Sequence, residues 1–136
     1  MKILIICSKQ FYSKIPSIKE QLEKKGHTIS LPNSYDNPNA ENEYKLKGEK
    51  DHIEFKQKMF KLSRDVIITQ DAVLVLNFEK NGVKNYLGGA TFLEMYEAFM
   101  NNKKIFLYND IPEGILKDEI CGFAPIVIHG DLSLVK

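Results

Sequence analysis

The chain has 136 residues, of which 43% are hydrophobic and 27% charged, and its formal net charge is +1. This composition is ordinary for a globular protein with one core, so we expect residues 1–136 to form a single domain. The balanced charge argues against a surface for a nucleic-acid polymer, and no apolar run approaches the roughly 20 residues of a membrane span.

Two cysteines, Cys7 and Cys121, lie far apart in the sequence and lack the spacing of metal ligands. Cys7 falls within an apolar run and Cys121 precedes a glycine, which favours two structural thiols over a disulfide. The apolar run near the start is too short for a secretory leader. These features predict a cytoplasmic protein.

The first third of the sequence predicts a β-α-β unit. Residues 2–7 form an uninterrupted apolar run, as expected for a strand buried on both faces of a parallel sheet. A connection at residues 8–13 leads into a helix from Lys14 to the neighbourhood of Gly26, which can provide the left-handed cap. Residues 27–31 alternate and stop at a proline, which predicts a second strand near the edge of the sheet.

Residues 33–50 break this regular pattern. They are rich in Asn, Glu, Lys, Gly and Pro and contain few apolar side chains. Two interpretations remain open, a mobile loop and a lid over a site. Beyond them, Asp51 and Glu54 have the spacing of a capping box that opens a second helix. The apolar face of this helix is predicted to comprise Phe55, Met59, Leu62 and Val66.

The remainder predicts three more strands, each preceded or followed by a helix. The expected elements are a strand at 71–77, a loop at 78–87, a helix from Gly88-Gly89 to about Asn102, a strand at 104–108, a turn at 109–112, a short helix at 113–120, a strand at 125–129 and a short tail. Alternation of this kind predicts an α/β fold with helices on both faces of a mostly parallel sheet. Five strands in this length favour the flavodoxin-like, Rossmann-like order 2-1-3-4-5.

In such a sheet, ligands bind beyond the carboxyl ends of the strands, where strands 1 and 3 diverge. Ser8, Asn77 and the Gly88-Gly89 turn flank this predicted crevice, and Asn109 lies one strand further out. Gly88 and Gly89 could hold a phosphate or a ribose through backbone N–H groups, or could form only a tight turn.

Glu94, one turn into the helix that follows, is the candidate catalytic residue. A carboxylate at the mouth of a cleft can act as a nucleophile or bind a sugar hydroxyl. Two structural interpretations compete with this one. Thr91 and Glu94 also fit a capping box, and Glu94 shares a helix face with Glu97 and Asn101 that could be the solvated one.

Other catalytic signals are weak. There is no G-x-G-x-x-G at the first helix and no Walker A pattern, which disfavours a tight dinucleotide or ATP site. Ser8 lacks the glycines of a nucleophile elbow. The three histidines, His27, His52 and His129, have no metal spacing, so we expect no metal and no cofactor.

The sequence resembles the nucleoside 2-deoxyribosyltransferase superfamily, which includes 2'-deoxynucleoside 5'-phosphate N-hydrolases. The resemblance spans most of the chain in pattern, and residues 71–105 carry its specific part. The matching runs are Ile3 to Ser8, Leu22 to His27, Asp71 to Asn77, Gly88 to Glu94 with Ala98, and Asn102 to Ile105. A weaker likeness, to lonely-guy type phosphoribohydrolases, lacks one glycine before Thr91.

The resemblance implies a flavodoxin-like homo-oligomer in which Glu94 attacks the anomeric carbon of a nucleoside. Two of the family's carboxylates are absent from the matching positions. The assisting aspartate falls on Ser63, with Asp65 expected to point elsewhere, and the base-contacting acid falls on Gly88. Tyr86, Asn77 or Tyr12 could donate a hydrogen bond to the departing base instead.

We therefore expect a small-molecule nucleoside or nucleotide ligand and N-glycosidic cleavage or 2-deoxyribosyl transfer by Glu94. The expected binding residues are Ser8, Tyr12, Asn77, Tyr86, Gly88, Gly89 and Asn109. The main alternative is a non-catalytic nucleotide-binding module of the same fold. A phosphate-sensing or scaffold role through oligomerisation is a third.

Overall fold

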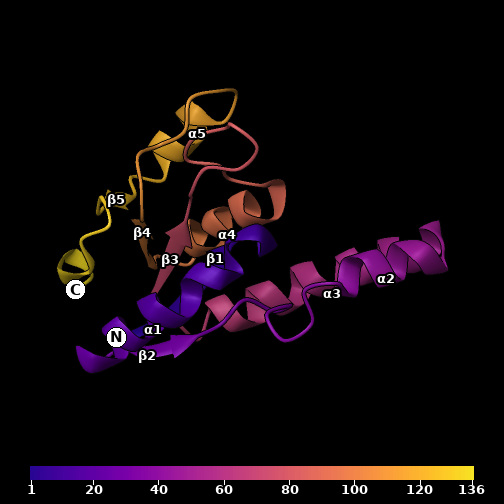
Figure 1. Ribbon diagram of the computed structural model, residues 1–136, viewed down its shortest axis with the longest axis horizontal. Helices are drawn as coiled ribbons and strands as arrows, with labels where there is room; N and C mark the ends of the chain where they lie inside the picture. The colour runs from indigo at the N-terminus through magenta and orange to yellow at the C-terminus, as the bar shows by residue number, and fades with distance from the viewer.

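The computed structural model describes residues 1–136 and contains one five-stranded sheet in which all neighbouring strands are parallel (Figure 1). The strands are β1 (Lys2–Cys7), β2 (Thr28–Ser30), β3 (Ala72–Leu76), β4 (Lys104–Leu107) and β5 (Ile126–Val127). Their order is β2-β1-β3-β4-β5, which confirms the predicted flavodoxin-like arrangement.

The central pair of the sheet, β1 and β3, is paired in register from Ile3 opposite Ala72 to Cys7 opposite Leu76. Every residue of β3 is buried, as are the last five of β1. Burial on both faces explains why these strands are continuous apolar runs without alternation. Their carboxyl ends therefore finish side by side.

Helices cover both faces of the sheet. Ile3 and Ile5 of β1 belong to the core on one face and Leu4 and Ile6 to the core on the other, because successive strand residues point in opposite directions. The first core is covered by η1 (Lys9–Lys14), α1 (Ile15–Lys24) and η2 (Leu132–Leu134), and the second by α3 (Glu49–Ile67), α4 (Gly89–Met100) and α5 (Lys117–Gly122).

Residues 33–50 contain a helix that the sequence pattern did not predict, α2 (Ala40–Lys47). The prediction of a structureless loop is wrong for these eight residues, whereas a lid over a site stays a prediction. Acidic side chains in the first turn and lysines in the last complement the helix dipole. Tyr44 stacks on Phe55 of α3 with 4.8 Å between ring centroids, and Figure 1 shows both helices extending beyond the sheet.

The start of α3 also differs from the prediction. The helix begins at Glu49, and its N-cap is Gly48, which makes no side-chain capping bond, so the capping box at Asp51 and Glu54 is wrong. Gly48 has φ +136°, a backbone conformation that glycine adopts readily, and this allows the chain to turn back sharply between α2 and α3. Leu62 is 39% exposed and Ile67 is buried, so the inward face runs through Ile67 instead.

The remaining elements occur where the sequence predicts them, with shifted bounds. The helix expected at 113–120 is α5, and β5 has two residues. Cys7 and Cys121 are both free thiols. None of the helices combines the length and apolarity that crossing a membrane would require.

Candidate functional site

A polar cleft of about 370 Å³ lies at the carboxyl end of β1, beside the N-terminus of α4. Ser8, Gly88, Gly89 and Glu94, four of the residues predicted from the sequence, line it together. The other lining residues are Cys7, Lys9, Gln10, Ser34, Pro38, Glu41, Asn42, Lys45, Lys56, Lys80, Ala90 and Thr91. The crevice thus lies at the predicted end of the sheet.

The N-terminus of α4 is free of side-chain caps. Gly88 is the N-cap, and no side chain accepts a hydrogen bond from the first turn. Thr91 is the third residue of the helix and is buried, so the capping box with Glu94 is wrong. Because the first N–H groups of a helix have no internal partners, they can bind an anion in the cleft.

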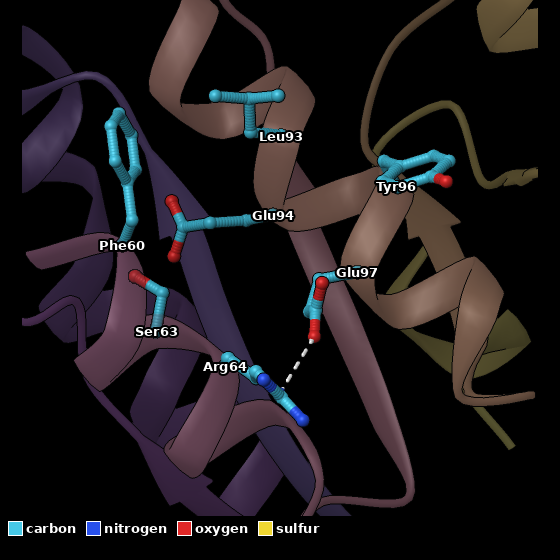
Figure 2. Close-up of a pocket in the computed structure, with 7 residues that line it drawn as sticks. All are labelled: Phe60, Ser63, Arg64, Leu93, Glu94, Tyr96 and Glu97. Carbon is cyan, nitrogen blue, oxygen red and sulfur yellow. Dashed lines mark ion pairs between the residues drawn. The ribbon is translucent and has the colours of Figure 1, made fainter. Parts of the chain in front are cut away.

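Glu94 is half-buried and points away from the solvated side of α4. Its side chain reaches toward α3, into the space between Phe60 and Ser63 (Figure 2). It lines the polar cleft, a neighbouring cavity of about 130 Å³, and a third of about 200 Å³. The fully solvated interpretation of its helix face is therefore wrong.

Burial raises the pKa of Glu94 from 4.5 to about 7. A hydrogen bond with the Ser63 side chain and the charge of Lys56 act in the opposite direction, lowering the pKa, but desolvation is the larger effect. A carboxyl group with this pKa changes its charge near neutral pH. It can therefore serve as a proton donor or as a carboxylate under mild conditions.

Ser63 lies where the resemblance would place an assisting aspartate. Its hydroxyl accepts a hydrogen bond from Asn33 Nδ2 at 2.8 Å, which leaves its own O–H to donate to Glu94. Ser63 follows Met59 and precedes Ile67 at intervals of four residues, so it is the polar member of the inward stripe of α3. Asp65 is exposed on the outer side of the helix.

The third cavity, drawn in Figure 2, is a partly apolar opening between α3 and α4. Phe60 and Leu93 line this cavity together with Glu94, and an ion pair of 3.6 Å joins Arg64 Nε to Glu97 Oε1. This ion pair engages the single arginine of the chain with Glu97. Glu94 thus has apolar neighbours on one side and polar neighbours in the main cleft.

Two protonated groups lie close to Glu94 on the β1 side. Burial raises the pKa of the Cys7 thiol to about 12, and the nearby Glu94 charge adds to this rise. Burial likewise raises the pKa of Tyr12 to about 12, with smaller effects from Cys7 and Glu94. Both groups are neutral at physiological pH, so Cys7 is not a thiolate nucleophile, and Tyr12 does not line the cleft.

Asn77 and Asn109 form a structural pair away from the cleft lining. Asn77 is fully buried, and its Oδ1 accepts from the Asn109 backbone N–H at 2.8 Å. Its Nδ2 donates to the backbone carbonyls of Asn109 and Asp110 at 3.3 and 2.9 Å. Asn109 Nδ2 returns a bond to the Asn77 carbonyl at 3.1 Å. These hydrogen bonds join the carboxyl ends of β3 and β4.

Tyr86 packs beside the Gly88 backbone. A Cβ placed on Gly88 would lie 3.5 Å from the Tyr86 hydroxyl, so that hydroxyl occupies the space next to the position of the missing acid. The ring packs edge-on against Phe11, and Lys80 Nζ lies 4.5 Å from its centroid. Lys80 also lines the cleft, whereas Tyr86 itself does not.

Sequence reasoning missed the charged residues that α2 and α3 bring to the cleft. Glu41 of α2 pairs with Lys45, His52 and Lys56 at 3.8, 3.3 and 3.6 Å. These partners lower the pKa of Glu41, although burial opposes them. The i, i+4 spacing of Glu41 and Lys45 was the available signal for a helix here.

No three His, Cys, Asp or Glu side chains lie close enough together to hold a metal ion. No protein-family model and no curated protein matches the chain. The resemblance to nucleoside 2-deoxyribosyltransferases therefore rests on the sequence pattern alone.

Proposed function

We propose that the protein binds a nucleoside or nucleotide in the polar cleft and cleaves its N-glycosidic bond, with Glu94 as the nucleophile. The observation that carries this proposal is the direction of the Glu94 side chain, which lines the cleft and has no capping role. The sequence resemblance assigns the same role to the same residue.

In this mechanism a carboxylate oxygen of Glu94 forms a bond to the anomeric carbon of the sugar. The bond from that carbon to the base nitrogen breaks, and its electron pair leaves with the base, which takes up a proton. Water or a second base then attacks the anomeric carbon and regenerates the Glu94 carboxylate. The outcome is hydrolysis with water, or deoxyribosyl transfer with a base.

Tyr86 is the proposed hydrogen-bond donor to the departing base. Its hydroxyl lies next to Gly88, where the family's base-contacting acid would stand, whereas the Asn77 amide is engaged with Asn109 and Asp110. A phenol hydroxyl can donate a hydrogen bond to a nitrogen or oxygen atom of the base.

The lining of the cleft suits the phosphate or ribose of a nucleotide. Four lysines and two glutamates face it, and the uncapped N-terminus of α4 contributes further positive potential. Nothing lies within 4 Å of a Cβ placed on Gly89, so a ligand can approach the backbone there closely. We assign the phosphate or ribose to this part of the cleft, beside Ser8.

A homo-oligomer is part of the proposal. Four large apolar side chains on α4 are 44–56% exposed, namely Leu93, Tyr96, Phe99 and Met100. Two of them, Leu93 and Tyr96, line the cavity of Figure 2. A second copy of the chain that covers them would also enclose Glu94, in a cytoplasmic dimer or larger assembly. Light scattering coupled to size-exclusion chromatography measures this directly.

A non-catalytic nucleotide-binding module is the second candidate. The observation that favours it is the raised pKa of Glu94, about 7, because a protonated carboxyl group is a poor nucleophile but a good donor to a sugar hydroxyl. In this case a ligand raises the melting temperature and no base is released.

Chromatography of base release from deoxynucleosides, ribonucleosides and their 5'-monophosphates tests the proposal. We expect release by the wild type from at least one compound and a loss of at least about a thousandfold in Glu94→Gln, as for removal of an essential nucleophile. Undiminished release by Glu94→Gln would refute the nucleophile. Stabilisation by a compound without release by either protein would favour the binding module.

A further inference from the structure

Lys56 occupies a position that links α2 to the Glu94 carboxylate. It lies on α3, its side chain is 31% exposed, and Nζ stands 3.6 Å from Glu41 Oε1. Its ammonium group also lies 5.4 Å from the centre of the Phe60 ring. Together with Glu94, Lys56 lines both the polar cleft and the cavity of about 130 Å³. Glu41 and Phe60 thus hold Lys56 at the wall of the cavity that Glu94 faces.

Three other cations near the site have partners of their own. Arg64 of α3 pairs with Glu97, and Lys45 of α2 pairs with Glu41. Lys80 lies over the Tyr86 ring.

Three further groups near Glu94 carry no charge at neutral pH. Ser63 is a hydroxyl, and Cys7 and Tyr12 are protonated and neutral. Lys9 follows the end of β1 and belongs to the wall formed by η1. Lys56 is the cation whose charge lowers the pKa of Glu94, opposing burial.

We propose that Lys56 is a positioning residue that favours the carboxylate form of Glu94, and that Glu41 of α2 holds Lys56 in place. This inference rests on the proposed role of Glu94 as the nucleophile. It gives a function to α2, because the helix supplies the carboxylate that fixes the ammonium group. A nucleophile must be ionised to attack, so Lys56 would extend the working range of the site to lower pH.

Carbon-13 NMR of the side-chain carboxyl groups tests this inference without a substrate, with the Glu94 signal assigned through Glu94→Gln. We expect Lys56→Gln to raise the titration midpoint of Glu94 by about one pH unit, the effect of losing a nearby opposite charge. Lys56→Arg should keep the midpoint within about 0.3 pH units of the wild type, since the charge remains. Lys58→Gln, an exposed lysine on the same helix, is the matched control and should leave it unchanged. An unchanged midpoint in Lys56→Gln would overturn the inference.

Glu41→Gln tests the holding role through the sign of its effect. If Glu41 holds Lys56, its loss releases the ammonium group and raises the Glu94 midpoint, and the double variant Glu41→Gln/Lys56→Gln matches Lys56→Gln alone. If Glu41 acts only as a like charge, its removal lowers the midpoint. A lowered midpoint would therefore overturn the role of α2.

The pH profile of base release separates this inference from the proposed function. With an active enzyme, the acid limb should move to higher pH in Lys56→Gln by the same amount as the NMR midpoint. A shifted midpoint without base release from any compound supports the electrostatic link and contradicts the glycosidase. Base release that depends on Glu94, with an unshifted midpoint and acid limb, supports the glycosidase and contradicts the role of Lys56.

Discussion

The hydroxyl group of Ser63 faces the carboxylate of Glu94 across the contact between α3 and α4 (Figure 2). Asn33 Nδ2 donates a 2.8 Å hydrogen bond to this hydroxyl. The residue that orients the carboxylate is thus a serine, at a position where the resemblance implies an aspartate. The arrangement supplies a hydrogen bond without adding a second negative charge beside Glu94.

Replacing Ser63 by alanine should raise the pKa of Glu94 above its value of about 7, because the hydrogen bond to the carboxylate is lost. We expect a rise of about one pH unit, measured by carboxyl NMR or by the acid limb of base release. Ser13→Ala, at an exposed position on η1, is the control. A pKa that stays the same or falls would mean that Ser63 does not stabilise the carboxylate.

The pKa of Glu94 also predicts how folding stability depends on pH. The folded state holds the proton up to about pH 7, and the ordinary value is 4.5, so the folded state binds more protons between these limits. The contribution of the raised Glu94 pKa to the free energy of unfolding is therefore fully present below pH 4.5, and it is lost as the pH rises through 7.

Glu94→Gln should consequently be more stable than the wild type at pH 8, by at most about 3 kcal/mol, and the difference should vanish near pH 4. Urea unfolding at several pH values measures it, and Glu54→Gln, at an exposed position on α3, is the control. Equal gains at all pH values would show that the effect is not due to ionisation.

Asn77→Ala should destabilise the fold by about 2–4 kcal/mol, because it removes the three hydrogen bonds that the buried Asn77 side chain makes with the backbone of Asn109 and Asp110. Urea unfolding measures the loss, with Asn37→Ala at an exposed position as the control. A loss no larger than that of the control would contradict the structural role of the Asn77–Asn109 pair.

Gly48→Ala tests the reversal between α2 and α3. Its φ of +136° is strained for any residue with a Cβ, so we expect a loss of about 1–3 kcal/mol or a displaced α2. Gly122→Ala is the matched control, since its φ is not positive and a Cβ there meets nothing within 4 Å. Equal stability of the two variants would show that the turn tolerates other conformations.

The strands and the place of the site were predictable because each depends on a local pattern. Apolar runs such as residues 2–7 reveal strands buried on both faces, and the chain order then brings Ser8, Gly88 and Gly89 to one cleft. Glu94 was predictable as a site residue because it comes one helical turn after the Gly88-Gly89 turn in the sequence.

The remaining features depend on contacts between distant segments. The α2 helix lacks an apolar stripe and is held by the stacking of Tyr44 on Phe55 and by the ion pairs of Glu41, so periodicity does not reveal it. Asn77 has a polar amide side chain that could bind a ligand, and only the structure shows that this side chain hydrogen-bonds with Asn109 instead. Thr91 and Glu94 fit a capping box by spacing, yet the helix begins earlier.

The most direct test of the central claim is a search for a covalent bond between Glu94 and the sugar. A nucleoside with a fluorine at the sugar 2-position slows the second step more than the first, because the electron-withdrawing group destabilises the oxocarbenium-like transition state and a good leaving base maintains the first step. Mass spectrometry of the intact protein, followed by peptide mapping, measures the outcome. We predict a single fluorosugar adduct on the peptide that contains Glu94, absent from Glu94→Gln. Base release without any adduct, or an adduct on another residue, would contradict Glu94 as the nucleophile.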